Sequence, residues 1–206
     1  MALRGDALYL RLKRLLDIAL ALAAAVVLAP IILLIALGIK LDSPGPVLFR
    51  QQRVGQGRRH FQILKFRTMR REAPAAVPTH LLAEPGAFIT RSGAFLRRTS
   101  LDELPQLLNI LKGDMSFVGP RPALYNQDDL IAERDRWGAN DVPAGLTGWA
   151  QINGRDELPI PVKAALDGDY ARRRSLGLDL KIMGLTIFRV FQSKGVREGG
   201  PGAPGL

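Results

Sequence analysis

The chain has 206 residues, enough for one domain with a sizeable hydrophobic core. Its 29 Lys and Arg residues against 19 Asp and Glu give a formal net charge of +10. That charge favours anionic partners: phosphorylated substrates, an acidic membrane surface or nucleic acid. The absence of cysteine excludes disulfides and thiolate metal sites, and a histidine-rich metal site is implausible with only His60 and His80. Any catalysis must use carboxylates and Lys or Arg, with or without a hard cation.

The N-terminal region reads as a membrane segment. Residues 1–17 form a basic, leucine-rich amphipathic lead-in suited to a headgroup surface, with cations at Arg4, Arg11, Lys13 and Arg14. The 22 residues from Ile18 to Ile39 carry no charge, which is long enough to cross a hydrocarbon core. A cleaved signal peptide is the alternative, but the run is too long for its apolar region and lacks a convincing cleavage site. We therefore expect membrane embedding.

Two features of this segment argue against a simple crossing. Pro30 lies in its middle, where it removes a backbone hydrogen bond and kinks a helix. Basic residues stand on both sides, such as Arg14 and Lys40, so the positive-inside rule gives no orientation. We expect a re-entrant helix with both flanks in the cytoplasm, although a kinked spanning helix remains an alternative.

A β-hairpin is expected next. Residues 47–49 and 60–66 have the composition of two strands and flank a turn at residues 55–57. Lys65 and Arg67 lie at the end of the second strand, and the simplest interpretation is a pair of solvated cations. Residues 70–86 are rich in Ala, Pro and charge, which indicates a mobile loop.

The most informative stretch contains the adjacent carboxylates Asp102 and Glu103. An apolar helical face follows them, which consists of Leu104, Leu107, Leu108 and Leu111. Lys112 and Gly113 then supply the signals that end a helix. The carboxylates are thus predicted at the positive end of a short buried helix, which favours their ionised form. An alternative without catalysis is a capping box formed by Ser100 and Glu103.

The rest of the chain predicts further helices around a tight loop. Residues 123–137 and 156–174 have helical patterns, and the glycine-rich residues 143–155 predict close backbone approaches that can also cradle an anion. Residues 179–191 alternate as a helix that either packs in the core or lies on a bilayer. The composition of the C-terminal residues predicts a disordered tail.

Together these features predict a mixed α/β fold, mostly helical with a small hairpin or sheet. The kinked re-entrant helix and amphipathic interfacial helices complete it. We expect a membrane-embedded segment at residues 1–40, a folded domain at 41–195, which the resemblance described below implies to be catalytic and cytoplasmic, and a tail at 196–206. No internal repeat or second domain is evident.

Four motifs, taken in order, carry a resemblance to a known family: KFRTM (65–69), RRTSLDELPQ (97–106), KGDMSFVGPRP (112–122) and GLTGWAQINGR (145–155). They resemble bacterial sugar transferases of the monotopic phosphoglycosyl transferase superfamily, from about Leu12 to Gly195. The length suggests its minimal members. The resemblance implies transfer of a phospho-sugar from a UDP-sugar to polyprenol (undecaprenyl) phosphate, with release of UMP, as the first membrane step of glycan assembly. It also implies Mg²⁺, a re-entrant helix with its kink at Pro30, and a catalytic domain on the cytoplasmic side of the bacterial inner membrane.

By the same resemblance, Asp102 is the nucleophile that attacks the sugar-bearing phosphorus and forms an aspartyl intermediate. Glu103 assists the second half as a base, and Asp102 is assigned to the metal. Motif matches nominate further residues for substrate binding: Lys65, Arg97, Arg121, Arg155 and, more weakly, Asp169. Arg67, Arg98 and Asp114 can equally be structural.

A competing hypothesis from the charge is a non-enzymatic, membrane-anchored protein that binds anionic lipid or nucleic acid. It predicts salt-sensitive binding that is indifferent to loss of Asp102 and Glu103. Nucleic acid is not an expected partner, because the chain has no recognition motif and only 6% aromatic residues.

Overall fold

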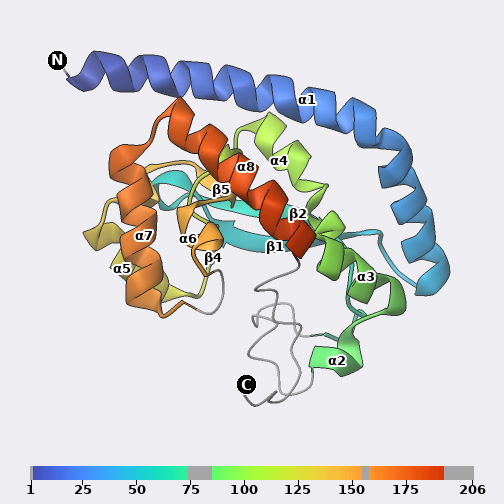
Figure 1. Cartoon of the computed structure of the whole chain (residues 1–206). Coiled ribbons are helices and arrows are strands. Elements are labelled where there is room, and N and C mark those ends of the chain that lie inside the picture. The colour runs from blue at the N-terminus through green and yellow to red at the C-terminus, as the bar shows by residue number, and fades with distance from the viewer. Residues whose placement is uncertain (1, 74–84, 155–157, 193–206) are drawn as a thin grey trace.

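The computed structural model describes residues 2–73, 85–154 and 158–192 (Figure 1). A long N-terminal helix lies across a domain of short helices and two small sheets. The helices and strands in chain order are α1 (Ala2–Asp42), β1 (Leu48–Val54), β2 (His60–Phe66), α2 (Pro85–Phe88), α3 (Arg91–Thr99), α4 (Gln106–Lys112), β3 (Met115–Val118), β4 (Ala123–Leu124), α5 (Asp128–Arg136), β5 (Ala144–Thr147), α6 (Trp149–Ile152), α7 (Ile160–Arg173) and α8 (Leu176–Gln192). Short 3₁₀ turns lie at Gln56–Arg58, Leu101–Glu103 and Ala139–Asp141.

The predicted hairpin is confirmed and is longer than expected. Strands β1 and β2 pair antiparallel from Leu48 opposite Phe66 to Val54 opposite His60. The turn between them uses Gly57 at φ 61°, a left-handed conformation that glycine adopts without strain. Strand β4 extends the sheet in the order β2-β1-β4, so β2 is an edge strand.

A second sheet is made by β3 and β5, which run parallel from Met115 beside Ala144 to Val118 beside Thr147. Close backbone contact beyond these strands requires glycine. A Cβ on Gly145 would lie 2.1 Å from the Gly119 nitrogen, and one on Gly148 would lie 2.1 Å from the Gly119 oxygen. The close approach predicted for the glycine-rich loop is therefore present, and it joins the loop after β3 to the start of α6.

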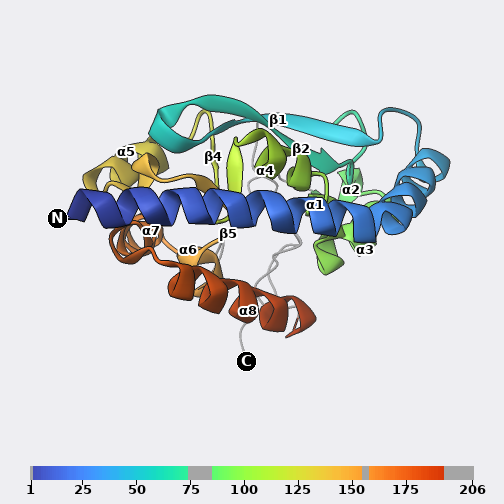
Figure 2. The same cartoon turned by 90° about the horizontal axis from the view of Figure 1, so that it is seen from above.

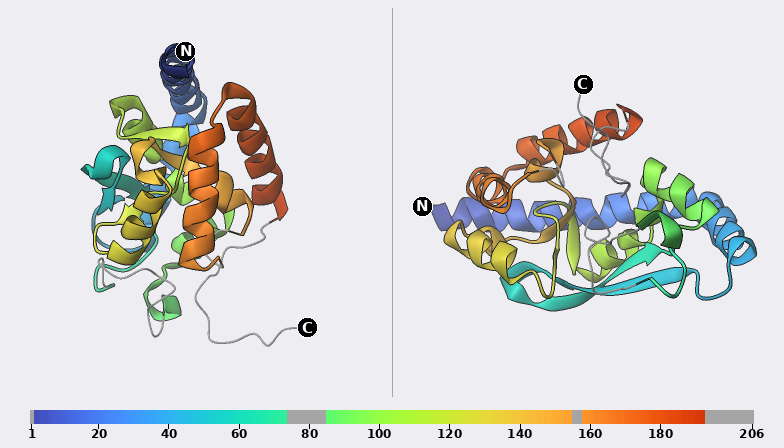
Figure 3. Two further views of the ribbon diagram at one scale, coloured as in Figure 1. Left: turned by 90° about the vertical axis from the view of Figure 1, so that its left-hand side faces the viewer. Right: turned by 90° about the horizontal axis from the view of Figure 1, so that it is seen from below.

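Helix α1 packs on the domain through one apolar face. Ala21 is fully buried in a cluster with Ile63, Leu107, Ile110 and Met115, and so α1 contacts β2, α4 and β3. Farther along α1, a second cluster gathers Ile39 with Phe66 and Leu96. Seen from above, α1 crosses the molecule between the hairpin and α8 (Figure 2), and the view from below agrees (Figure 3).

Polar contacts fasten both ends of α1 to the same domain. In its N-terminal half, Lys13 donates to Asp179 Oδ2 at 2.8 Å, and Asp17 Oδ1 accepts from the Phe117 backbone nitrogen at 3.1 Å. Arg14 Nη2 donates to the Leu111 carbonyl at 2.8 Å. Just past the C-terminal end, Arg67 donates to the Ser43 and Pro44 carbonyls at 2.6 and 2.7 Å. Arg67 is 5% exposed, so its interpretation as a solvated cation is wrong, and these contacts fit the structural role that the sequence left open.

By length and composition, one described helix could cross a membrane: the Ala7–Asp42 part of α1, with a peak mean hydropathy of 3.0. Pro30 lies inside it, and Figure 1 shows that α1 bends sharply toward its C-terminal end. The outer face of the helix exposes a continuous set of large apolar side chains, among them Leu15, Leu22, Val26, Val27, Leu33, Leu34, Leu37 and Leu41. Such a face is an association surface for lipid or protein.

The predicted fold class, mostly helical with a small sheet and a long apolar N-terminal helix, is confirmed. The helix predicted over 123–137 begins only at Asp128, because Ala123 and Leu124 pair with β1 as β4. Helix α8 packs partly in the core, since Ile182 is fully buried, while Ile187 and Phe188 are 61% exposed; contact of this exposed part with a bilayer stays a prediction. The loop predicted at residues 70–86 and the tail at 196–206 lie mostly or wholly outside the described residues.

Candidate active site

The adjacent carboxylates Asp102 and Glu103 lie in a 3₁₀ turn between α3 and α4. Ser100, just before them, has the left-handed conformation with φ 58°, which reverses the chain after α3. A non-glycine residue in this conformation is uncommon and tends to occur at functional sites. Asp102 is 8% exposed and the Glu103 side chain 18%, so both carboxylates are largely buried.

The capping box proposed for Ser100 and Glu103 is wrong. Ser100 makes no side-chain cap hydrogen bond, and α4 begins only at Gln106 with Pro105 before it. The Glu103 side chain contacts cations instead of returning to the backbone of Ser100. The end of the helix is as predicted, because Gly113 closes α4 at φ 93°.

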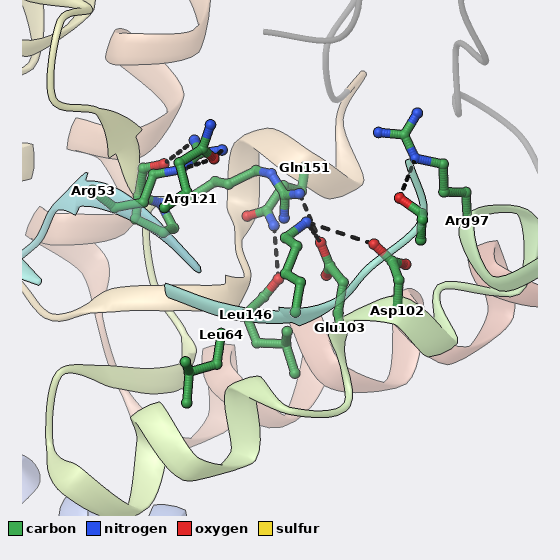
Figure 4. A network of polar contacts seen from close by, with 12 residues as sticks. Arg53, Leu64, Arg97, Asp102, Glu103, Arg121, Leu146 and Gln151 are labelled. Atoms are coloured by element: carbon green, nitrogen blue, oxygen red, sulfur yellow. Dashed lines mark hydrogen bonds and ion pairs between the residues drawn. The ribbon is translucent and has the colours of Figure 1, made fainter. Parts of the chain in front are cut away.

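Two cations converge on Glu103 from separate elements. Lys65 Nζ, near the end of β2, and Arg121 Nη2, in the loop after β3, each donate to Glu103 Oε1 at 2.7 Å. Lys65 Nζ also lies 3.8 Å from Asp102 Oδ2. Figure 4 shows the labelled Arg121, Glu103 and Asp102 side chains pointing toward one another. The sequence-based nominations of Lys65, Arg121, Asp102 and Glu103 therefore fall in one site.

The two carboxyl groups have opposite pKa shifts. Burial raises the pKa of Asp102, a shift that the charge of Glu103 reinforces and that Lys65, Arg121 and Arg97 oppose. Burial also raises the pKa of Glu103, but Arg121 and Lys65 outweigh it and hold that pKa well below its usual range. The sequence-based expectation that Asp102 is held ionised is therefore opposed by its burial, which raises its pKa.

This arrangement predicts opposite responses of Asp102 to changes in its two neighbours. In metal-free protein, Lys65→Met should raise the pKa of Asp102 because it removes a stabilising cation. Glu103→Gln should lower it, because a like charge is removed. Carboxyl ¹³C NMR titration, with Asp102→Asn to assign the signal, measures both shifts. A shift of the same sign in both variants would contradict this electrostatic account.

An asparagine fastens the strand of Lys65 to the helix that follows the two carboxylates. Asn109 on α4 is 1% exposed; its Oδ1 accepts from the Leu64 nitrogen at 2.9 Å, and its Nδ2 donates to the Gln62 carbonyl at 2.7 Å. Because β2 is an edge strand, these groups would otherwise be unpaired. Sequence reasoning missed Asn109. Asn109 lies off the predicted apolar face, and the structure turns that side of α4 inward, with Asn109 and Ile110 buried and Leu108 47% exposed.

Of the other residues predicted to bind substrate, Arg97 lies near the carboxylate pair and Asp169 bonds within its own helix. Arg97, at the end of α3, donates through Nε to Thr68 Oγ1 at 3.1 Å and lies close enough to affect the pKa of Asp102. Asp169 forms surface ion pairs on its own helix α7, with Arg173 at 2.9 Å and Arg172 at 3.7 Å. Arg155 lies outside the described residues. Asp114 accepts from Asn109 at 3.2 Å, as its structural interpretation predicts.

Two glutamines near these motifs were not predicted as site residues. Gln106 is fully buried four residues after Asp102, and neither polar atom of its amide has a hydrogen-bond partner among the described residues. Gln151 Nε2 on α6 donates to the Leu146 carbonyl, while its Oε1 is buried without a partner in the same part of the chain. Buried polar atoms normally have partners, so these amide atoms are suited to hydrogen-bond a buried water.

Magnesium binding can be tested against these donors. The described residues contain no group of three or more His, Asp or Glu side chains that could hold a metal ion. A site with only one or two carboxylates is still compatible with Mg²⁺, because this ion commonly binds one or two carboxylates together with waters and substrate phosphates. Asp102 is the suited ligand, since Glu103 Oε1 already accepts from two cations.

Comparisons with known proteins give a consistent result. The sequence profile of the family described as "Bacterial sugar transferase" matches residues 8–193. The chain is 45% identical to a UDP-glucose:undecaprenyl-phosphate glucose-1-phosphate transferase of Xanthomonas campestris, over 88% of this chain and 39% of the relative. It is 38% identical to a UDP-N-acetylgalactosamine-undecaprenyl-phosphate N-acetylgalactosaminephosphotransferase of Aeromonas hydrophila, over 92% of this chain and 46% of the relative.

A third relative has a similar length. It is the uncharacterized sugar transferase EpsL of Bacillus subtilis, 41% identical over 91% of both chains. The chain thus spans about two fifths of the Xanthomonas relative and nearly all of the Bacillus one. The match over residues 8–193 includes both carboxylates and both of the cations on Glu103. The chain belongs to the bacterial sugar transferase family.

Proposed function

We propose that this protein transfers a phospho-sugar from a UDP-sugar to polyprenol phosphate and releases UMP. The observation that carries the proposal is the partly buried Asp102–Glu103 pair with Lys65 and Arg121 gathered on it. Nucleoside diphosphate sugars need positive charge around their phosphates, and a carboxylate can act as a phosphoryl acceptor. The names of the Xanthomonas and Aeromonas relatives specify this class of reaction for those proteins.

In the proposed first step, an oxygen of the Asp102 carboxylate attacks the sugar-bearing phosphorus. The bond from that phosphorus to the bridging oxygen breaks, and UMP departs with the bridging oxygen. In the second step, a phosphate oxygen of polyprenol phosphate attacks the same phosphorus and releases the carboxylate. The raised pKa of Asp102 is consistent with a better nucleophile than an exposed aspartate, since basicity and nucleophilicity rise together.

The cations have a separate task in this proposal. The site has one more cation than carboxylates, since Lys65, Arg121 and Arg97 surround two carboxylates. This net positive charge favours binding of a diphosphate. Glu103 keeps Lys65 and Arg121 in place through its Oε1. Its lowered pKa makes it a weak base, so we assign Glu103 mainly to holding these cations rather than to the predicted proton transfer.

Magnesium belongs to the proposal as well, with Asp102 as its protein ligand. When bound, Mg²⁺ would offset charge on the diphosphate and on the paired carboxylates.

We also propose that α1 is a re-entrant helix in the cytoplasmic membrane, with both its ends and the catalytic residues on the cytoplasmic side. Lys13 and Asp17 near one end, and the Ser43 and Pro44 carbonyls at the other, all contact the same domain. A helix fixed at both ends to one domain does not place those ends on opposite sides of a bilayer. The outward-facing leucines and valines of α1 would face lipid.

Cysteine labelling tests this topology directly, because the chain has no native cysteine. Ala7→Cys near the N-terminus and Arg59→Cys on the hairpin are both exposed positions. A membrane-impermeant maleimide should label both only when the cytoplasmic face is accessible. Val27→Cys, whose native side chain is 73% exposed on the apolar face, serves as a lipid-shielded control. Labelling of positions 7 and 59 from opposite sides would indicate a spanning helix.

The function is tested by UMP release from a panel of UDP-sugars in the presence of polyprenol phosphate and Mg²⁺. UDP-glucose and UDP-N-acetylgalactosamine are included because both occur in the names of relatives. We expect UMP release and a polyprenyl-diphosphate sugar with at least one donor. Salt-sensitive lipid binding without UMP release from any donor would favour the non-enzymatic alternative.

A further inference from the structure

The loop at residues 119–122 is held by its backbone. Because Pro120 and Pro122 have no N–H, the loop is fastened mainly through carbonyls. Gly145 N donates to the Pro120 carbonyl at 2.8 Å, Arg134 Nη1 to the Arg121 carbonyl at 2.9 Å, and Arg53 Nη1 to the Pro122 carbonyl at 3.0 Å. Three successive carbonyls are therefore engaged, two of them by arginines from other elements.

Arg134 itself is fixed by a carboxylate from a third element. On α5, its Nε and Nη2 donate to Asp167 Oδ2 of α7 at 2.8 and 2.6 Å. The side chains of Arg134 and Asp167 are 4% and 1% exposed. The planar guanidinium has little freedom to rotate, because Nε and Nη2 bond to Asp167 while Nη1 bonds to the Arg121 carbonyl.

A chain of polar contacts thus leads from α7 to the carboxylate pair. Asp167 binds Arg134, Arg134 binds the Arg121 carbonyl, and the Arg121 side chain reaches Glu103 at 2.7 Å. A buried ion pair is weak evidence for stability, since desolvation offsets much of its attraction. The bond from Arg134 to the Arg121 carbonyl indicates that the ion pair fixes the position of Arg121.

We propose that Arg134, fixed by Asp167, is a positioning residue for Arg121. It holds the Arg121 carbonyl and so aims the guanidinium at Glu103 and the substrate phosphates. This inference rests on the proposed function, in which Arg121 stabilises the transferring phosphoryl group. It assigns the carboxylate of α7 that acts on the site to Asp167, in place of the predicted Asp169.

A double-mutant cycle tests the proposal. Arg134→Lys keeps a cation beside Asp167 but cannot reproduce the three directed bonds. We expect it to lower kcat of UMP release about tenfold, with a smaller change in KM for the UDP-sugar. A misplaced Arg121 guanidinium should weaken stabilisation of the transition state more than binding of the substrate. In an Arg121→Ala background the same change should cost about twofold or less. Equal losses in both backgrounds would overturn the proposal, because Arg134 would then act without Arg121.

A matched control and a second readout complete the design. Arg136→Lys lies on the same helix at an exposed position and should leave kcat unchanged. In ¹⁵N NMR of arginine side chains, the Arg121 Nε signal should become mobile in Arg134→Lys and stay ordered in Arg136→Lys. An ordered Arg121 in Arg134→Lys would contradict positioning. Should that variant not fold, Asp167→Asn, which keeps an oxygen for Arg134, replaces it. Absence of UMP release by the wild type would count against the proposed function alone, while the NMR result still decides the positioning role.

Discussion

Asp102→Asn is expected to reduce UMP release at least about 1,000-fold, since an amide cannot attack phosphorus in place of a carboxylate. The substitution keeps the size of a side chain that is 11% exposed, so the turn at Leu101–Glu103 should persist. The measurement is single-turnover UMP release with a UDP-sugar that the wild type accepts. Thermal unfolding of the same preparation checks that the fold is intact.

Asp114→Asn is the matched control for this variant. Asp114 follows the same helix α4, and its carboxylate accepts from Asn109 Nδ2 at 3.2 Å. The substitution removes this charge, while Asn109 Nδ2 keeps its bond to the Gln62 carbonyl at 2.7 Å. We expect UMP release close to that of the wild type. Wild-type turnover in Asp102→Asn would show that the nucleophile has been assigned to the wrong residue.

Asp179→Ala is expected to destabilise the protein by about 3–5 kcal/mol, which is typical when one member of a buried ion pair is removed. Its carboxylate accepts from Lys13 at 2.8 Å, Tyr9 at 3.0 Å and Tyr170 at 2.8 Å. The side chains of Lys13 and Asp179 are 7% and 6% exposed, so the substitution removes the acceptor of a buried cation and of the Tyr9 hydroxyl, while the Tyr170 hydroxyl keeps the Val118 carbonyl at 3.1 Å. A lower midpoint of thermal unfolding in detergent micelles measures the loss.

Because these contacts join α1 to α7 and α8, the same variant should release the N-terminal half of α1. Limited proteolysis near residues 9–17 reports that release. Lys13→Met combined with Asp179→Leu removes both charges and should recover much of the stability. Arg136→Ala, which breaks an exposed ion pair with Glu133, should cost less than about 1 kcal/mol. Equal loss in Asp179→Ala and Arg136→Ala would contradict a structural role for the buried pair.

Local patterns predicted the elements with strong periodicity. The uncharged run predicted α1, the turn at residues 55–57 predicted the hairpin, and Gly113 predicted the end of α4. The boundaries that failed depend on tertiary pairing. Ala123 and Leu124 have a helical composition, but β1 offers them a strand partner, and so α5 begins at Asp128.

The site was predicted in part, and the gaps have a common cause. Lys65, Asp102, Glu103 and Arg121 lie in motifs and meet in space. Asp167 and Arg134 lie on helices with ordinary polar patterns, and the signal that separates Asp167 from Asp169 is burial, which depends on how α5 and α7 pack. Spacing along one helix does not reveal which of two nearby carboxylates faces another element.

In the proposed reaction, Asp102 carries the phospho-sugar between donor and acceptor. The most direct measurement incubates wild-type protein with Mg²⁺ and a UDP-sugar labelled in the sugar, before any polyprenol phosphate is added, and quenches it rapidly. If Asp102 forms the intermediate, we expect label on the peptide that contains Asp102 and release of about one UMP per labelled protein. The label should move to lipid when polyprenol phosphate is added. Formation of the lipid product with no label on the protein at any time would contradict this role of Asp102.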